Sequence, residues 1–279
     1  MKKYIAIRGG GSNFIGELGA IAACYDKGIM QPLEFAGTSA GSILSTLLAV
    51  GYTTSELHPM LMNQDFSLFE DDENYLRLLE HNGGIYKGDY LLNWIEGMVT
   101  NKMGKPLATF ADLGAKNLPT LWVVATDVAN DDYVTFDRFN TPDMPVALAV
   151  RCSMSVPFVF KAAQYDGKTY VDGGLKLNYP ITLFDDEAEE EVLGIFPHDV
   201  HGVAEPLDVS TNAALAKSVF ENLLDSQNSY LFSNKKWLSQ TILADTFGNS
   251  PMNFKNLPTE RKQQLYQAGY DSAIAFINK

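Results

Sequence analysis

Short apolar runs alternate with amphipathic stretches over the first 50 residues of the chain. Residues 4–7 form a mostly apolar run that ends at three glycines, which predicts a buried strand entering a loop. Apolar residues recur at helical spacing over 15–27 and again over 42–50, and a second short strand is predicted at 33–36. This order of strand, glycine loop, helix, strand, glycine turn and helix is typical of an α/β domain with a largely parallel sheet.

The pattern changes after residue 52. Residues 53–117 are mostly helical in pattern and are interrupted by glycines, which predicts an excursion from the sheet that serves as a cap or a substrate-facing wall. Strands then return, and we predict them at 121–126, 133–136, 169–171 and 192–196.

Two amphipathic helical patterns, at 209–245 and 258–277, follow the last predicted strand. We expect them to form a C-terminal helical extension, about residues 205–279, that packs on the core. The sequence has neither an internal repeat nor a low-complexity linker. We therefore predict one domain over residues 1–279, with a three-layer α/β/α fold and a largely parallel central sheet.

The charge balance narrows the classes of partner. The 279 residues carry a formal net charge of −13, and phosphate contacts need clustered Lys and Arg, so we expect no nucleic-acid partner. An anionic membrane surface repels this charge on average, although a local basic face would override that. The acidic runs 70–73 and 185–191 lack the spaced ligands of a calcium loop. We expect solvated loops or helix starts there, and no metal or other cofactor.

The sequence carries no Sec-type targeting signal and no membrane span. The apolar run at 4–7 is too short for a signal-peptide core, and no stretch approaches the length of a membrane-spanning helix. Cys24 and Cys152 lie in apolar stretches, which predicts buried, reduced thiols and a reducing compartment. We expect a soluble protein that is cytoplasmic or is delivered by a signal-peptide-independent route.

The stretch Gly37-Thr38-Ser39-Ala40-Gly41 contains a candidate nucleophile. It spans the turn between a predicted strand and a predicted helix, which is the arrangement of a nucleophile elbow. The two glycines allow strained dihedral angles, so the Ser39 hydroxyl would project at the carboxyl end of the strand. The helix that follows aims its N-terminal N–H groups at any anion formed there. The alternative is a glycine-rich helix start in which Ser39 is only the N-cap.

A serine nucleophile needs a base, and the histidines are weak candidates. Two lie in the excursion and two in a turn-like segment after the last strand, and chain order in a Ser-His-Asp triad permits only the later pair. Surface loops are the favoured interpretation for all four, which are His58, His81, His198 and His201.

Asp172 is the better candidate for the base. It follows the predicted strand at 169–171 and precedes Gly173 and Gly174, so its carboxyl sits at a strand end against bare backbone. Burial beside a neutral serine would raise the pKa of Asp172 above the usual value of ~3.9 and strengthen it as a base. Taken alone, an Asp-Gly-Gly stretch is typical of an ordinary turn.

The order of three motifs resembles that of the bacterial patatin-like phospholipases. A Gly9-Gly10-Gly11 loop, the serine motif and the Asp172 motif follow one another as in that family, which uses a Ser–Asp dyad without histidine. The resemblance covers about residues 4–277 and includes the segments GGIYKGDYLLNWI, LWVVATDV, AVRCSMSVPFVF and YVDGGLKLNYP. It implies the patatin-like Ser–Asp hydrolase fold, with Ser39 as nucleophile and Asp172 as base.

The resemblance also implies an oxyanion hole made by N–H groups of the glycine loop, where the loss of one donor typically costs about 10²–10³ in rate. The family loop continues Gly-Gly-Gly-x-Arg/Lys-Gly, whereas this chain has Asn13 and Phe14 at the last two positions. The Asn13 amide, or Arg8 before the loop, would then replace the missing cation. The expected loop donors are Gly9, Gly10, Gly11, Ser12 and Asn13.

These features together predict a lipid acyl hydrolase of the phospholipase A or lysophospholipase type, acting through an acyl-enzyme intermediate. Its partners would be a lipid or acyl-ester substrate and a membrane surface in transient contact, and an activating protein partner stays open. The alternatives are a small-ester carboxylesterase, an acyltransferase on the same site, and a lipid-binding protein with weakened catalysis.

Overall fold

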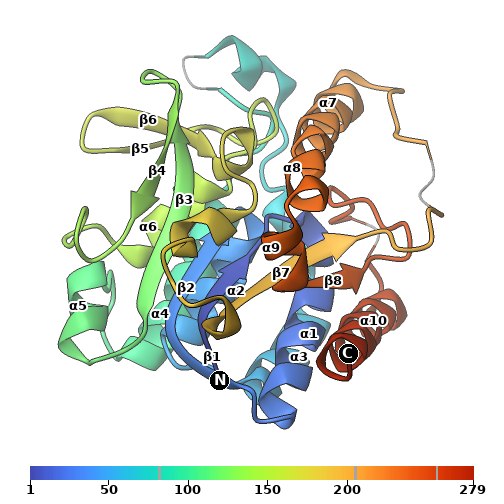
Figure 1. Ribbon diagram of the computed structural model, residues 1–279. Helices are drawn as coiled ribbons and strands as arrows, with labels where there is room; N and C mark the ends of the chain where they lie inside the picture. Colours follow the sequence, from blue (N-terminus) through green and yellow to red (C-terminus); the bar gives the residue numbers. More distant parts are fainter. Residues whose placement is uncertain (81–82, 204–205, 256) are drawn as a thin grey trace.

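The computed structural model of the chain describes residues 1–80, 83–203, 206–255 and 257–279, and its centre is an eight-stranded sheet (Figure 1). The strand order is β5-β6-β3-β2-β1-β7-β8, and β4 pairs with β3 as well. The five central strands from β3 to β8 run parallel, whereas β4, β5 and β6 pair antiparallel. The strands are β1 (Lys2–Ile7), β2 (Met30–Thr38), β3 (Thr120–Asp127), β4 (Asp132–Phe136), β5 (Ala163–Tyr165), β6 (Lys168–Asp172), β7 (Val192–His198) and β8 (Thr241–Asp245).

Helical segments cover both faces of the sheet (Figure 1). Side chains alternate along β1, so Ile5 and Ile7 enter the main core while Ala6 joins a smaller cluster with Phe184 on the other face. The α-helices are α1 (Phe14–Asp26), α2 (Ala40–Ala49), α3 (Thr54–Asn63), α4 (Asp89–Met103), α5 (Phe110–Ala115), α6 (Val146–Ser153), α7 (Asn212–Ser226), α8 (Asn228–Ser233), α9 (Lys235–Ser239) and α10 (Thr259–Ile277). The 3₁₀ helices are Gly11–Asn13, Phe66–Phe69, Tyr75–Leu79, Gly173–Leu175, Pro180–Phe184 and Glu189–Glu191.

The predicted fold class, a three-layer α/β fold with a mostly parallel sheet, is confirmed. One element was wrong, because residues 241–245 lie within a predicted helical stretch but form β8. This short segment pairs in parallel with β7, from Gly194–Thr241 to His198–Asp245. A five-residue apolar run carries too little periodicity to distinguish a strand from a helix, so tertiary pairing decides its conformation.

Two helices of the predicted excursion at 53–117 contribute buried residues to the main core. Thr53 and Glu56 form a capping box that starts α3. Leu57 of α3 and Ile95 of α4 are fully buried in the main core. The stretch between these two helices, by contrast, contributes residues to the cavities beside α7.

Glu70 departs from the expectation that the acidic runs at 70–73 and 185–191 are solvated. Most residues of 185–191 are exposed, as are Asp72 and Glu73, but the Glu70 carboxylate is buried between Lys217 Nζ at 2.6 Å and Lys255 Nζ at 3.1 Å. Burial opposes ionisation of Glu70, yet the ion pairs outweigh it and lower the pKa of the carboxyl. Glu70 therefore ties α7 to the segment before α10.

The two cysteines are buried with free thiols, as their apolar surroundings predict. No helix within the described parts of the chain combines the length and the apolar character needed to cross a membrane.

Helix α10 packs along α1 (Figure 1) through a contact that needs glycine. A Cβ atom on Gly19 of α1 would overlap the backbone carbonyl of Tyr266, and one on Gly269 of α10 would overlap the carbonyl of Gly16. The backbones of the two helices thus touch without intervening side chains. The C-terminal helix is held against the N-terminal part of the chain by this close approach.

We predict opposite effects of one methyl group in two helices. Gly19→Ala places a Cβ against the Tyr266 backbone and should lower the free energy of unfolding by roughly 1–3 kcal/mol. Gly97→Ala in α4 meets no atom within 4 Å and should be neutral or stabilising by up to about 1 kcal/mol. Urea denaturation of both variants measures the difference, and equal stabilities would contradict the proposed contact.

Candidate active site

Ser39 occupies the turn between β2 and α2 in a strained backbone conformation. Strand β2 ends at Thr38, α2 begins at Ala40, and Ser39 between them has φ 51° and ψ −128°. Non-glycine residues seldom adopt these dihedral angles, and such strain gathers at functional sites. The Ser39 N–H donates to Ser153 Oγ at 2.8 Å, and Ser153 Oγ donates to the Val124 carbonyl of β3 at 2.5 Å.

The glycines of the motif allow the close crossing of strand and helix. A Cβ on Gly37 would lie 2.5 Å from the Gly41 carbonyl oxygen and from Ser45 Oγ. A Cβ on Gly41 would lie equally close to the carbonyl oxygens of Ile7 and Arg8, at the end of β1. Helix α2 therefore starts directly against two strand ends, as a nucleophile elbow requires.

Asp172 is the last residue of β6, and its carboxyl is fully buried. Its Oδ1 accepts the Gly174 N–H at 2.7 Å, while Oδ2 has no partner with hydrogen-bond geometry among the described residues. Burial raises the pKa of Asp172 to about 7, and the nearby Ser39 hydroxyl and the Gly174 N–H partly counter this rise. The Ser39 hydroxyl therefore favours the ionised form of Asp172.

The register of β3 brings the two sequence-predicted residues together. Thr38, next to Ser39, pairs with Val124 of β3, and Asp172 pairs with the adjacent Ala125 on the same edge, because β4 occupies the opposite edge along both stretches. The Thr126 hydroxyl donates to the Asp172 carbonyl at 2.9 Å, which strengthens this register. The Asp172 N–H donates to the Ser155 carbonyl at 2.9 Å.

The two glycines after Asp172 keep the approach to the serine motif free of side chains. A Cβ on Gly173 would overlap the Val124 carbonyl and lie 3.0 Å from Thr38 Cγ2. A Cβ on Gly174 would lie 2.6 Å from Leu224 Cδ2, so this glycine sits directly beneath α7. The Asp172 turn is therefore packed between β3 and α7.

Three of the five expected loop donors are used within the fold. The N–H groups of Gly9, Ser12 and Asn13 donate to the carbonyls of Asn178, Pro251 and Gly10, at 3.0, 2.8 and 3.1 Å. The N–H groups of Gly10 and Gly11 have no hydrogen-bond partner among the described residues. Gly11 adopts φ 52° where a Cβ would overlap the Pro251 carbonyl, so the loop conformation depends on glycine there.

The two positions at which this loop differs from the family pattern have structural roles. Asn13 Nδ2 donates to the Asn249 carbonyl at 3.1 Å, and Asn13 Oδ1 accepts from Asn249 Nδ2 at 2.8 Å. Phe14 is fully buried and packs edge-on against Phe66, with ring centroids 5.3 Å apart. The Asn13 amide is therefore engaged with the 249–251 segment and does not replace the missing cation.

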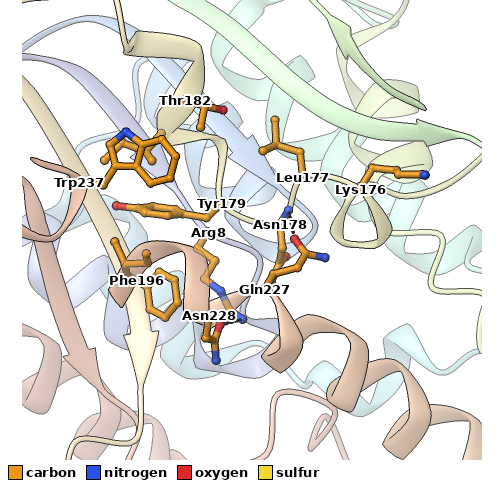
Figure 2. Close-up of a pocket in the computed structure, with 12 residues that line it drawn as sticks. Arg8, Lys176, Leu177, Asn178, Tyr179, Thr182, Phe196, Gln227, Asn228 and Trp237 are labelled. Atoms are coloured by element: carbon orange, nitrogen blue, oxygen red, sulfur yellow. Dashed lines mark hydrogen bonds between the residues drawn. The ribbon is translucent and has the colours of Figure 1, made fainter. Parts of the chain in front are cut away.

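Arg8 is also turned away from the serine. Its guanidinium donates to the carbonyl oxygen of Gly9 and to Asn228 Oδ1, at 3.1 and 2.9 Å, and lies over the ring of Phe196. Figure 2 shows it in a cavity of about 280 Å³ that has Asn178 and Gln227 in its wall, while neither Ser39 nor Asp172 lines this cavity. Arg8 thus supports the glycine loop from behind.

Two further residues next to the glycine loop were not singled out in the sequence. Asn178 is buried, and its Nδ2 donates to the Gly9 carbonyl at 3.3 Å. Glu17 of α1 is fully buried beneath Gly10, and neither carboxylate oxygen has a hydrogen-bond partner among the described residues. Burial raises the pKa of Glu17 well above its usual range despite the opposing charge of Arg8.

A feature of the sequence could have identified each of these residues. Glu17 is an isolated acid within an apolar helical stretch, and Asn178 follows the Asp172 motif inside the segment that resembles the family. Ser153, which holds the Ser39 N–H, and Ser155, which holds the Asp172 N–H, are fully buried polar residues in AVRCSMSVPFVF.

The described histidines make their contacts elsewhere. His58 Nε2 lies 3.2 Å from Gln263 Oε1, His201 Nε2 lies 3.2 Å from Asp245 Oδ2, and the His198 ring packs against Phe232. His81 lies outside the described residues. Within the described ranges, no three side chains of His, Cys, Asp or Glu gather in a way that could hold a metal ion.

The fold and the geometry at Ser39 define a class of α/β proteins in which a serine stands on a sharp strand-to-helix turn. The family model of the patatin-like phospholipases matches residues 5–185. The chain therefore belongs to the patatin-like phospholipase family.

Relatives of similar sequence come from viruses and bacteria. The uncharacterized protein R571 of Acanthamoeba polyphaga mimivirus is 30% identical over 99% of this chain and 94% of its own length. The uncharacterized protein YqhO of Bacillus subtilis is 33% identical over 67% of this chain and 68% of its own. A probable lipid hydrolase, 463L of invertebrate iridescent virus 6, is 28% identical over 65% of this chain and 62% of its own.

Two solved structures share the fold. VipD of Legionella pneumophila has a TM-score of 0.74 at 17% identity, over 99% of this chain and 67% of VipD. ExoU of Pseudomonas aeruginosa, in complex with SpcU, has a TM-score of 0.56 at 15% identity, over 100% of this chain and 53% of ExoU. At these identities the likeness concerns the fold.

We predict that Asp172 makes stability depend on pH. Its pKa is raised in the folded state, so its protonated form favours folding at low pH, and this contribution is lost as the pH rises from about 4 through about 7. The Asp172→Asn variant lacks this titration while Glu17 titrates in both proteins. Between about pH 5 and about pH 8, the free energy of unfolding of the variant should therefore rise relative to that of the wild type, by up to about 1.4 kcal/mol per pH unit. Urea denaturation at the two pH values measures this change. A constant difference would contradict the raised pKa.

Proposed function

We propose that the protein is a lipid acyl hydrolase of the phospholipase A or lysophospholipase type, with Ser39 as nucleophile and Asp172 as base. Membership of the patatin-like phospholipase family supports the hydrolase activity. The observation that carries the residue assignment is the fully buried Asp172 carboxyl beside the strained Ser39, with a pKa of about 7. A carboxylate with that pKa is ionised in part at neutral pH and is a far stronger base than an exposed one.

The proposed reaction has two halves. Asp172 takes the proton from Ser39 Oγ as this oxygen attacks the carbonyl carbon of the ester, which forms a tetrahedral intermediate with a negatively charged oxygen. The intermediate collapses, the bond to the alcohol breaks, and Asp172 returns the proton to the leaving oxygen. Asp172 then takes a proton from water, which attacks the acyl-serine. As the bond to Ser39 Oγ breaks, Asp172 returns this proton to Oγ, and the fatty acid leaves.

The oxyanion would be held by the N–H groups of Gly10 and Gly11. Among the expected loop donors, these two have no partner in the described parts of the fold. Arg8 and Asn178 hold the Gly9 carbonyl from behind, which keeps the loop fixed in one position before the substrate arrives. Burial raises the pKa of Glu17 beneath Gly10, which disfavours a negative charge beside the oxyanion.

Hydrolysis of smaller esters, transfer of the acyl group to another alcohol, and lipid binding without turnover are the alternatives. The first two differ from the proposal in the size of the ester and in whether water resolves the acyl-serine. Release of fatty acid from a diacyl phospholipid, its lyso form and a short nitrophenyl ester separates these activities. ExoU was crystallised with SpcU, and inactivity of the pure protein on all three esters would favour a missing protein partner or a binding role.

We expect Ser39→Ala and Asp172→Asn each to lower fatty-acid release by at least about 10³-fold, because both halves of the reaction need both residues. A fluorophosphonate should label the wild type at Ser39 and should fail to label Ser39→Ala. Ser45→Ala, which changes a buried serine of α2 outside the dyad, is the control and should remain active. Retained activity in Asp172→Asn, together with its loss on substitution of His198 or His201, would make the dyad assignment wrong.

The pH dependence of kcat/KM provides a second test. Asp172 acts as a base, so activity should rise about tenfold per pH unit below its pKa and level off above about 7. Measurement on the nitrophenyl ester between about pH 5 and pH 9 gives this limb. An activity that is already constant from about pH 5 upward would exclude a base with the raised pKa of Asp172.

A further inference from the structure

An apolar groove of about 620 Å³ runs beside the candidate active site. One wall is α7, and the opposite wall is the segment that follows α6. None of the residues described in its lining is charged, and Thr169 contributes the one polar side chain. The groove therefore has the chemistry of a hydrocarbon surface rather than of a site for a polar ligand.

Four large apolar side chains at the rim of the groove face solvent. Val128, Phe158, Val219 and Leu223, the rim residues, are between 46% and 65% exposed. Val219 and Leu223 are four residues apart on α7 and so share one face of the helix. A single exposed apolar residue is ordinary on a protein surface, but a rim of four around an apolar groove indicates an interaction surface.

Phe158 is held in the exposed position by a strained backbone. Its φ is 65°, in the left-handed region that a phenylalanine seldom adopts. The Phe158 carbonyl accepts the Ile85 N–H at 3.0 Å, which fixes this conformation. Strain of this kind persists where the surroundings enforce it and gathers at functional positions. An aromatic ring that is directed into water by strained backbone has no role in packing the core.

The groove is continuous with the candidate active site. Val171 and Leu175, on either side of the Asp172–Gly174 turn, both line it. Leu224 of α7, next to the rim residue Leu223, lies against Gly174, and Gln227 Nε2 donates to the Gly174 carbonyl at 2.5 Å. A chain that enters the groove from its rim therefore reaches the turn that carries Asp172.

The charge distribution selects the kind of surface that fits the rim. Two ion pairs are formed by residues close in sequence to the lining, Lys176–Asp131 at 2.7 Å and Lys168–Asp127 at 3.7 Å. Within each pair the two charges cancel. The chain as a whole carries −13, which an anionic surface would repel. Protein interfaces carry many hydrogen bonds, whereas the described lining of the groove offers a single polar side chain, that of Thr169.

We propose that the rim residues dock this protein on a zwitterionic lipid surface, so that an acyl chain passes from the surface into the groove beside Asp172. This docking role rests on the lipid acyl hydrolase function proposed above. Insertion of four apolar side chains, without clustered basic residues, predicts binding that depends on apolar contact and little on salt.

The test is a triple variant that replaces three of the four rim residues, all but Val128, and leaves the backbone preferences intact. Phe158→Asn suits the positive φ, and Val219→Gln with Leu223→Gln keeps good helix formers on α7. The matched control is Leu107→Asn with Met60→Gln, because Leu107 is also exposed at positive φ and Met60 is exposed on α3. In Figure 1 the α4–α5 connection, which holds Leu107, lies far from α7.

Binding is measured by sedimentation with phosphatidylcholine vesicles in a Ser39→Ala background, which separates docking from turnover. The triple variant should bind at least tenfold more weakly than its parent, and the control should bind as the parent does. In the active background, the ratio of vesicle hydrolysis to hydrolysis of a monomeric short-chain ester should fall by a similar factor. Urea denaturation checks that the variants are folded.

Several results would overturn the docking role. They are parent-like binding by the triple variant, absence of parent binding to phosphatidylcholine, and binding that needs anionic lipid and is lost in high salt. A change of oligomeric state in the triple variant, seen by sedimentation velocity in place of a change in vesicle binding, would point to a second copy of the chain. If the wild type hydrolyses no ester while the triple variant loses vesicle binding, the hydrolase function fails and the rim is still supported as a lipid-binding surface.

Discussion

The pairing of β3 with β2 and with β6 determines where Ser39 and Asp172 lie. Thr38 pairs with Val124 and Asp172 with Ala125 on the same edge of β3, so two segments more than 130 residues apart meet end to end along one strand. Neighbouring strands are about 4.8 Å apart, and a slip of one residue turns every side chain to the opposite face. Ser153 bridges the Ser39 N–H and the Val124 carbonyl at this point, so the strained turn and the register support each other.

Burial of acids near the glycine loop has two different consequences. Asp172 keeps one backbone donor, the Gly174 N–H, and has Ser39 beside it, so its pKa is held at about 7. Glu17 has no hydrogen-bond partner among the described residues, and burial raises its pKa well above the usual range. The same physical cause, loss of water around a carboxylate, therefore acts on both acids, and the donors around Asp172 are what favour its ionised form.

Helix α7 connects the candidate active site, the apolar groove and the N-terminal half of the chain, and much of its attachment is polar. Lys217 pairs with the buried Glu70, Ser250 Oγ donates to Glu221 at 2.7 Å, and Gln227 binds the turn after Asp172. Phe220 and Leu224 are its buried apolar anchors. Each of these hydrogen bonds replaces one to water, so its net contribution to stability is small compared with the burial of a large apolar side chain. The attachment of α7 therefore depends on several partners at once.

The local pattern of the sequence was enough to predict the βαβα order, the strand-to-helix turn at Ser39 and the strand that ends at Asp172. These features depend on neighbouring residues, because glycines permit the turn and apolar periodicity identifies the elements. The tertiary structure decided that residues 241–245 form β8, that Glu70 is buried, and that Asn13 and Arg8 face away from the serine. It also decided which loop N–H groups stay without partners and that an apolar groove forms beside Asp172. Each of these depends on segments far apart in the chain, and single-sequence periodicity does not report which of them meet.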